Sequence, residues 1–230
     1  MEARVCVLAG DGVGEEVTQE SMKVLEAICR KFDHNFEFIH ALVGGAAIDK
    51  FNNPLPPESM NLALGSDAIL FGAVGGPKWD NPSADVRPED AILALRKRLG
   101  LYANMRPVKV YPELLHSSPL KPEFLEGVDF VIVRELTGGL YFGRPKRRSA
   151  STRGRRAVDT LAYSEKEIAR VVRVAFELAK SRRQRLHSLD KMNVLETGRL
   201  WREIANEVSR DYPEVELIHM LADNAAMKII

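Results

Sequence analysis

The chain has 230 residues, 45% of them hydrophobic and 28% charged, and a formal net charge of +1. This is ordinary composition for a globular protein, long enough for one large domain or two small ones, and the charge balance gives no polyelectrolyte signal. No signal peptide precedes the first strand and no apolar stretch reaches about 18 residues, so we expect a cytoplasmic protein without a membrane segment. Cys6 and Cys29 are expected to be buried reduced thiols rather than a disulfide.

The first hundred residues alternate between strand and helix patterns. The predicted strands span residues 4–9, 36–42 and 67–76. The predicted helices span residues 15–31, 56–65 and 89–100. The third strand is a near-continuous apolar run, which is typical of a sheet buried on both faces. The first helix is expected to turn one apolar face to the core: Val17, Met22, Val24, Leu25 and Ile28.

Near residue 101 the pattern changes to closely spaced strand-like segments, at 101–110, 128–136, 138–143 and 157–164. A long helix follows to about Arg182, with Ser164 and Glu167 spaced as a capping box. The last predicted elements are a strand, a helix, a strand and the start of a helix: 185–191, 194–211, 215–221 and 223 onward. We therefore expect an α/β protein with a first domain at 1–101 and a second at 102–230.

The segment "VCVLAGDGVGEEV", residues 5–17, ends an apolar strand in three glycines. A dinucleotide-binding turn requires G-x-G-x-x-G, but Glu15 stands where the third glycine is needed. Glu15 and Glu16 also suit the dipole at a helix start better than they suit a bound pyrophosphate. The spacing therefore argues against a Rossmann site.

Three arginines lie beside apolar segments: Arg96, Arg106 and Arg134. An arginine in such a place needs an anionic partner, because an unpaired buried charge is costly. The partner is either an internal Asp or Glu or a bound ligand. Three together favour a small di- or tricarboxylate, since guanidinium groups bind carboxylates in a bidentate geometry.

Three further residues could carry chemistry, and each also has a purely structural interpretation. Tyr141 follows two glycines that allow close backbone approach, or it packs on a hairpin. Lys191 ends a strand and could act as a base if desolvated, or it is a solvated lysine. Asp223 begins the last helix, where it could bind Mg²⁺ or cap the helix.

Six segments in order resemble the isocitrate/isopropylmalate dehydrogenase family of β-decarboxylating enzymes, and within it the isopropylmalate branch of leucine biosynthesis. They are "LAGDGVGEEV", "GAVGGPKWD", "ILALRKRLGLYANMRPVKVYP", "VRELTGGLYFG", "DKMNVLETGRLWRE" and "HMLADNAAM". The resemblance covers essentially the whole chain. It implies a two-domain α/β fold unlike the Rossmann fold, in which the glycine turn lies near the nicotinamide end of NAD.

The resemblance also implies a role for each matching residue. Arg96, Arg106 and Arg134 would bind the malate carboxylates. Lys191 would help to remove the hydroxyl proton as hydride leaves to NAD⁺, and Tyr141 would protonate the enol after CO₂ is lost.

Cofactor roles follow from the same resemblance. The residues near NAD would be Val13, Gly75, Gly76 and Asn193. Asp223 would bind Mg²⁺ or Mn²⁺, which stabilises the enolate. Lys191 and Asp223 would act in the partner subunit's site, so a homodimer is implied.

The residues before Arg96 discriminate within the family. Isocitrate dehydrogenases place Ser and Asn six and four residues before the matching arginine to hold a third carboxylate, where this chain has Asp90 and Ile92. Ile92 and Leu93 form an apolar patch suited to an isopropyl group, with Glu89 one turn earlier. A carboxylate there would be unpaired, so 3-isopropylmalate is the expected substrate.

Residues 144–156 carry seven Lys and Arg and no acid, and without them the chain has 26 basic residues against 32 acidic ones. We expect a solvated loop or hairpin rather than a nucleic-acid site, because the segment lacks interleaved aromatic residues. The resemblance places here an arm that interlocks subunits.

The final helix shows no closing signal after Ile230, and chains of the resembled family continue beyond it. We therefore expect a fragment with an incomplete first domain, which alone is weakly active or inactive. The alternative is a catalytically incomplete dimerising or regulatory subunit that pairs with a full-length partner through residues 102–230.

Overall fold

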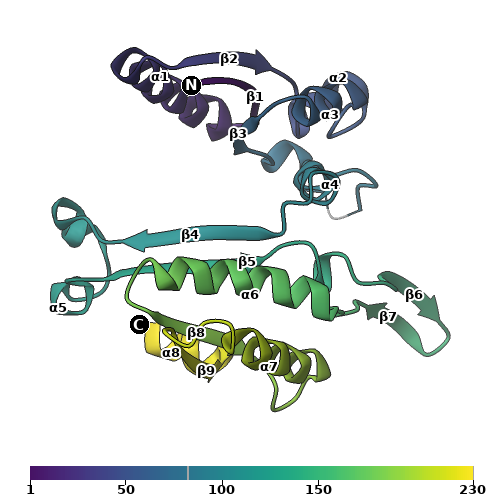
Figure 1. Cartoon of the computed structure of the whole chain (residues 1–230). Coiled ribbons are helices and arrows are strands. Elements are labelled where there is room, and N and C mark those ends of the chain that lie inside the picture. The colour runs from purple at the N-terminus through teal and green to yellow at the C-terminus, as the bar shows by residue number, and fades with distance from the viewer. Residues whose placement is uncertain (82, 230) are drawn as a thin grey trace. The chain divides into compact units, whose positions relative to one another are not determined.

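The computed structural model describes residues 1–81 and 83–229, and the chain divides into two compact units, Met1–Leu99 (unit 1) and Gly100–Ile230 (unit 2) (Figure 1). The described part of the chain contains no helix long and apolar enough to cross a membrane. Both cysteines are free, as predicted, but only Cys6 is buried, whereas Cys29 is half-buried. Burial raises the pKa of the Cys6 thiol.

Unit 1 is built on a parallel sheet of three strands in the order β2-β1-β3. The strands are β1 (Glu2–Gly10), β2 (Asn35–His40) and β3 (Ala68–Ala73). The middle strand β1 supplies the most buried stretch, residues 5–8. Its continuous apolar run suits a position between two neighbours with both faces covered.

The helical segments of unit 1 are α1 (Val13–Phe32), α2 (Gly45–Phe51), α3 (Pro57–Leu64), η1 (Pro77–Trp79) and α4 (Asp90–Arg98). The prediction for α1 was wrong at two positions of its apolar face, because Val17 and Val24 are 46% and 59% exposed. The buried positions are instead Gly14 and Thr18. A Cβ on Gly14 would lie 2.3 Å from the carbonyl oxygen of Ala9, so only a very small residue permits this close packing.

Unit 2 contains three separate two-stranded ladders. They are the antiparallel pair β4 (Ala103–Lys109) and β5 (Asp129–Glu135), the hairpin β6 (Arg147–Ser151) and β7 (Gly154–Val158), and the parallel pair β8 (Arg185–Asp190) and β9 (Glu216–Leu221). Its helices are η2 (Pro112–Ser117), α5 (Pro122–Leu125), η3 (Gly139–Tyr141), α6 (Glu165–Lys180), α7 (Glu196–Ser209) and α8 (Ala222–Ile229).

The strand predicted at 138–143 is instead the 3-10 turn η3. Gly139 has a φ of 70°, and the Gly143 amide donates to the Gly139 carbonyl over 2.9 Å, which closes the turn. The strand predicted at 157–164 survives only in its first two residues, at the end of β7. The sequence patterns did not predict α2, η2 or α5.

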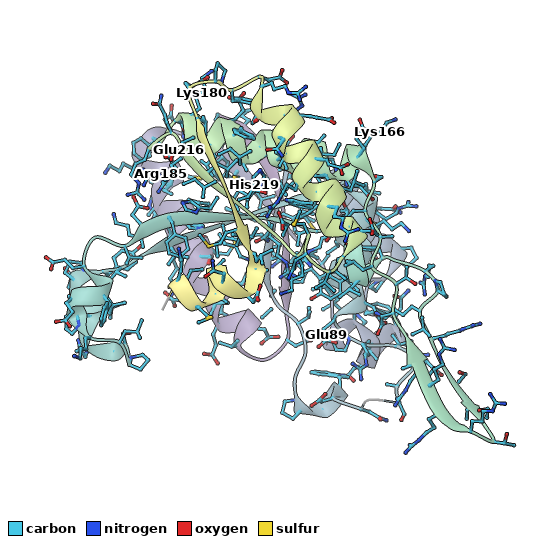
Figure 2. The ribbon with its side chains drawn as sticks, turned by 90° about the horizontal axis from the view of Figure 1, so that it is seen from below. Glu89, Lys166, Lys180, Arg185, Glu216 and His219 are labelled. Atoms are coloured by element: carbon cyan, nitrogen blue, oxygen red, sulfur yellow. The ribbon has the colours of Figure 1, made fainter. Side chains whose placement is uncertain are left out.

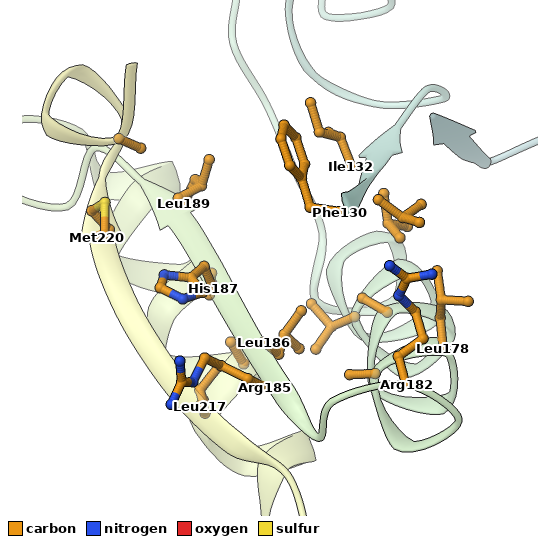
Figure 3. Close-up of a pocket in the computed structure, with 18 of the residues that line it drawn as sticks. Phe130, Ile132, Leu178, Arg182, Arg185, Leu186, His187, Leu189, Leu217 and Met220 are labelled. Carbon is orange, nitrogen blue, oxygen red and sulfur yellow. The ribbon is translucent and has the colours of Figure 1, made fainter. Parts of the chain in front are cut away.

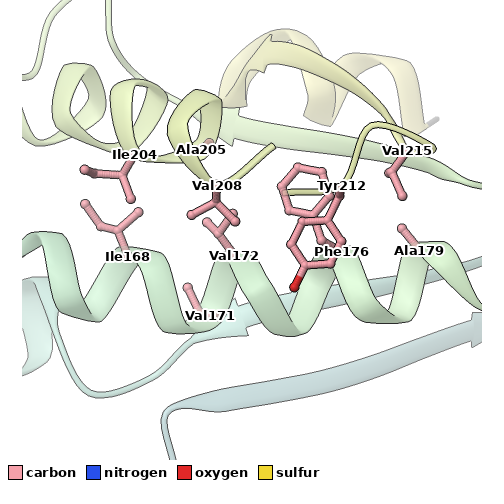
Figure 4. Packing of buried hydrophobic residues seen from close by; sticks show 10 residues of the cluster. All are labelled: Ile168, Val171, Val172, Phe176, Ala179, Ile204, Ala205, Val208, Tyr212 and Val215. Carbon is pink, nitrogen blue, oxygen red and sulfur yellow. The ribbon is translucent and has the colours of Figure 1, made fainter. Parts of the chain in front are cut away.

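Helix α6 forms the core of unit 2 by packing against α7 (Figure 4). Its N-terminus carries the predicted capping box between Ser164 and Glu167. Phe176 is fully buried and stacks on Tyr212 with ring centroids 4.9 Å apart. Val133 of β5 and Leu217 of β9 pack against the same cluster, so α6 connects the β4–β5 and β8–β9 ladders.

The basic segment forms the β6–β7 hairpin, one of the two conformations expected of it. Residues 144–157 are all exposed, and the hairpin side chains point outward in Figure 2. Among the ion pairs of the described residues, none involves an arginine of this hairpin.

Candidate functional site

The glycine turn of unit 1 is organised by Asp11, whose side chain is buried directly after β1. Its carboxylate accepts hydrogen bonds from three backbone amides: Gly45 at 2.6 Å, Ala46 at 2.7 Å and Gly75 at 3.0 Å. The first two belong to the start of α2, where a negative charge is favourable. The carboxylate of Asp11 therefore ties the turn after β1 to the start of α2 and to the Gly75 loop.

The Gly75–Gly76 loop lines a pocket of 450 Å³ in unit 1 together with Trp79, Arg87 and Glu89. Gly75 has a φ of 103°, and a Cβ there would lie 2.9 Å from the Glu89 carboxylate. The loop therefore presents bare backbone beside an acidic side chain. Val13, also predicted near the cofactor, is 59% exposed at the start of α1.

Helix α4 carries the residues predicted to distinguish substrates. Glu89, Ile92, Leu93 and Arg96 follow the spacing i, i+3, i+4 and i+7, so they lie along one side of the helix. Ala91 and Leu95 are buried and anchor the helix to the core of unit 1. The exposed Glu89 thus precedes the half-buried apolar pair and the arginine on a single stripe.

In unit 2, the β4–β5 ladder brings Arg106 and Arg134 to one face. Asn104 pairs with Arg134 across the ladder, and Arg106 lies two residues along from Asn104. The Arg106 guanidinium donates to the Asn104 side chain over 2.7 Å. Val133, on the opposite face, packs toward α6, so the two arginines lie on the face directed away from that helix.

Tyr141 joins this group from η3. Its hydroxyl accepts a hydrogen bond from Arg134 over 3.3 Å, and the guanidinium lies 5.7 Å from the ring centroid. The tyrosine is 51% exposed. A tyrosine hydroxyl beside an arginine can bind a carboxylate and transfer a proton to an adjacent carbon or oxygen.

Lys191 and Asp223 form the second group of unit 2. They follow β8 and β9, which are parallel, so both lie at the carboxyl end of that ladder, where open α/β sheets commonly bind ligands. Lys191 Nζ lies 2.9 Å from Asp223 Oδ1. This hydrogen bond is the main cause that lowers the pKa of Asp223, and backbone amides lower it further. Asn193 is exposed in the turn after Lys191.

A divalent metal needs more ligands than this group provides, since Mg²⁺ takes about six oxygen ligands. Asp223 supplies one carboxylate, already paired with Lys191. Within residues 1–81 and 83–229, no group of three or more His, Cys, Asp or Glu side chains could hold a metal. These residues therefore do not form a metal site by themselves, and Asp223 can be only one ligand of a site that other groups complete.

Hydrogen bonds and ion pairs of the described residues join Tyr141 to Arg134 and Lys191 to Asp223, and none joins these two groups. A cavity of 690 Å³ in unit 2 contains none of the predicted site residues (Figure 3). Its lining includes the consecutive residues 130–133 of β5 and 185–189 of β8, so it is bounded by the edges of two strands rather than by their faces.

Sequence reasoning missed two buried carboxylates that support these groups. Asp190, immediately before Lys191, binds Arg202 of α7 through contacts of 2.9 and 3.1 Å. Glu135, immediately after Arg134, is paired with Arg170 of α6 at 3.6 Å. The available signal was an acidic residue directly following an apolar strand, in "VIVRE" and "LHSLD".

The chain belongs to the isocitrate/isopropylmalate dehydrogenase family, whose model matches residues 4–230. The chain is 55% identical over 230 residues to the 3-isopropylmalate dehydrogenase of Priestia megaterium and 55% identical over 227 residues to that of Geobacillus kaustophilus. These matches cover 100% and 99% of this chain but only 62% and 61% of the two relatives. The resemblance drawn from the six segments is confirmed.

Solved structures confirm the predicted fold class. Isocitrate dehydrogenase from Methylococcus capsulatus superposes with a TM-score of 0.82 at 25% identity, over 98% of this chain and 62% of that protein. A β-decarboxylating dehydrogenase from Thermococcus kodakarensis gives 0.70 at 31% identity, over 98% and 60%. The chain thus spans about three fifths of these structures, as it does of the curated relatives.

Proposed function

We propose that the chain forms the substrate-binding part of an NAD-dependent enzyme that oxidatively decarboxylates 3-isopropylmalate to 2-oxoisocaproate in leucine biosynthesis. The observation that carries this proposal is 55% identity across the whole chain to 3-isopropylmalate dehydrogenases. Because the chain spans about 62% of those relatives, the activity is assigned to the protein that contains it. A cytoplasmic location is part of the proposal.

The substrate's two carboxylates are anions, and the chain offers three arginines for them. We assign Arg106 and Arg134 on one face of the β4–β5 ladder to this binding, together with Arg96 on α4. Ile92 and Leu93, beside Arg96 on the same stripe of the helix, would contact the isopropyl group. An apolar pair without a fixed hydrogen-bond partner disfavours a third carboxylate at this position, which argues for isopropylmalate over isocitrate.

Two proton transfers are needed around the hydride transfer. Bound NAD⁺ supplies the hydride acceptor. Lys191, acting as the neutral amine, takes the proton of the substrate hydroxyl as the ketone forms. After CO₂ leaves, the hydroxyl of Tyr141 donates a proton to the enol carbon. Arg134 holds that hydroxyl 3.3 Å away and so fixes the donor.

We assign cofactor binding to the glycine-rich backbone of the Gly75–Gly76 loop in unit 1. Gly75 and Gly76 line the 450 Å³ pocket, and Asp11 holds the Gly75 amide, which keeps this loop in place. Val13 and Asn193 are exposed and free of packing that would prevent contact with a nicotinamide. Asp223 is assigned as one ligand of Mg²⁺ or Mn²⁺, which would stabilise the enolate when bound.

A homodimer with shared sites is the proposed assembly. Its support is the family match, because the resemblance implies that Lys191 and Asp223 act in the partner subunit's site. Within one chain, Lys191 pairs with Asp223 and Tyr141 with Arg134. The assignment of a first domain near residues 1–101 and a second domain with the dimer arm, including the β6–β7 hairpin, belongs to the same proposal.

The test is a chimera of residues 1–230 joined to the part of the Priestia megaterium relative outside the matched region. The expected result is NADH formation with isopropylmalate and Mg²⁺, and much slower formation with isocitrate. The variant Ile92→Asn is expected to weaken this preference, with Ala94→Asn as the control on the same helix. A folded chimera that oxidises isocitrate faster than isopropylmalate would refute the substrate assignment.

A further inference from the structure

We propose that Arg170 and Glu135 form a positioning pair that holds the loop carrying Tyr141, so that the tyrosine hydroxyl stays beside Arg134. The role of Tyr141 as proton donor rests on the proposed function, whereas the positioning itself rests only on contacts within unit 2.

Glu135 is the last residue of β5, and its side chain is 2% exposed. One carboxylate oxygen accepts from the Thr137 amide at 2.9 Å and from the Thr137 hydroxyl at 2.7 Å. The other accepts from the Gly138 amide at 2.8 Å. The carboxylate therefore organises the backbone of the loop directly before η3, with Gly139 and Leu140 alone between these contacts and Tyr141.

Arg170 reaches this carboxylate from α6. Its Nη2 lies 3.6 Å from Glu135 Oε1 and also donates to the Thr137 hydroxyl, which in turn donates to Glu135. Its guanidinium carbon lies 4.6 Å from the Tyr102 ring centroid. The arginine thus joins a helix to the loop through a connected chain of hydrogen bonds, in which each bond polarises the next.

The contacts of Arg170 with the loop are made through one end of its guanidinium. Its Nη2 faces both Glu135 and the Thr137 hydroxyl, whereas its Nε has no hydrogen-bond partner among the described residues. A shorter or uncharged side chain at this position would therefore lose both contacts together.

The loop is also held from its other side, so it has little room to adopt a different path. Gly138 and Gly139 pack against Tyr163, whose ring would lie 2.7 Å from a Cβ on Gly138. The Gly139 amide donates to the Ala162 carbonyl over 2.9 Å. With this side fixed by packing, the Glu135–Arg170 side sets the direction in which η3 leaves the sheet, and hence the place of Tyr141.

The test uses the whole chain labelled with 3-fluorotyrosine, with the Tyr141 fluorine resonance assigned from Tyr141→Phe. Arg170→Met is expected to shift or broaden that resonance, and to speed hydrogen exchange at the Thr137 and Gly138 amides by about tenfold relative to α6 amides. The matched control is Arg173→Met, which removes the exposed Arg173–Asp211 ion pair of the same helix and is expected to change neither readout. If Arg170→Met does not fold, Thr137→Val breaks the same hydrogen-bond chain.

The proposal is overturned if Tyr141 and the two amides behave alike in Arg170→Met and Arg173→Met. In the active chimera, Arg170→Met is expected to lower kcat about tenfold with an unchanged KM for isopropylmalate, because the substrate still meets its arginines. An inactive unsubstituted chimera would refute the proposed function and leave the fluorine and exchange results standing.

Discussion

Breaking the Asp190–Arg202 pair, whose carboxylate is buried, is expected to be among the most damaging single changes in unit 2. The Asp190 side chain is 0% exposed, and Arg202 binds both of its oxygens, at 2.9 and 3.1 Å. Among the described residues, Arg202→Met leaves the carboxylate with one hydrogen-bond donor, the Met192 amide at 3.1 Å. Removing one partner of a buried pair costs about 3–5 kcal/mol, because the remaining charge is uncompensated.

The matched control is Arg185→Met in the same unit. Arg185 and Glu216 lie 2.8 Å apart, but their side chains are 61% and 57% exposed (Figure 2). An exposed pair contributes about 0–1 kcal/mol. The assay is urea unfolding followed by circular dichroism at pH 7.5. Equal losses of unfolding free energy in the two variants would refute the reasoning about burial.

His219 gives this prediction a pH dependence. Burial and then the positive charge of Arg202 lower the pKa of His219, while Asp190 raises it. In the unsubstituted chain, stability from the neutral imidazole is present above about pH 6.5 and is lost as the pH falls toward the lowered pKa. In Arg202→Met the repulsion is gone and Asp190 attracts the imidazolium. The cost of the substitution should therefore be smaller at pH 5.5 than at pH 7.5.

Three further substitutions test the packing and the caps. Asp11→Ala removes the acceptor of three backbone amides and should destabilise unit 1 by about 3 kcal/mol, measured by urea unfolding; a loss below about 1 kcal/mol would contradict the assigned network. Phe176→Ala should cost about 3–5 kcal/mol in thermal unfolding, whereas Phe124→Ala, at a side chain 59% exposed, should cost less than about 0.5 kcal/mol. Ser164→Ala removes the capping box and should cost about 1 kcal/mol, and no change in the melting temperature would show that the cap is unimportant.

The order of most strands and helices was predictable because their apolar spacing is set by contacts with one nearby surface. The long helix from Ser164 shows this, since its periodicity and capping box are both local. The prediction failed at 138–143, where Gly139 adopts a positive φ and contacts Ala162, a residue far along the chain. The predicted buried face of α1 was wrong because the helix approaches the sheet through the small residues Gly14 and Thr18. The spacing of apolar residues does not reveal such a contact.

The sequence identified the candidate site residues but not the buried carboxylates that support them. Arg134, Tyr141, Lys191 and Asp223 stand in recognisable segments, and the structure pairs them as Arg134 with Tyr141 and Lys191 with Asp223. The carboxylates that hold the neighbouring backbone were missed. An acidic residue after a strand is solvated or buried according to what a distant helix brings to it, and that partner is not visible in local sequence.

Complementation between two chimeras, one with Tyr141→Phe and the other with Lys191→Met, measures directly whether the site is shared between subunits. Each variant alone is expected to form almost no NADH from isopropylmalate. Unfolded together and refolded, they should regain about a quarter of the unsubstituted rate, because half of the random dimers contain one site with both groups intact. A mixture that stays inactive, while the unsubstituted chimera is active after the same refolding, would contradict a site shared by Tyr141 of one subunit and Lys191 of its partner.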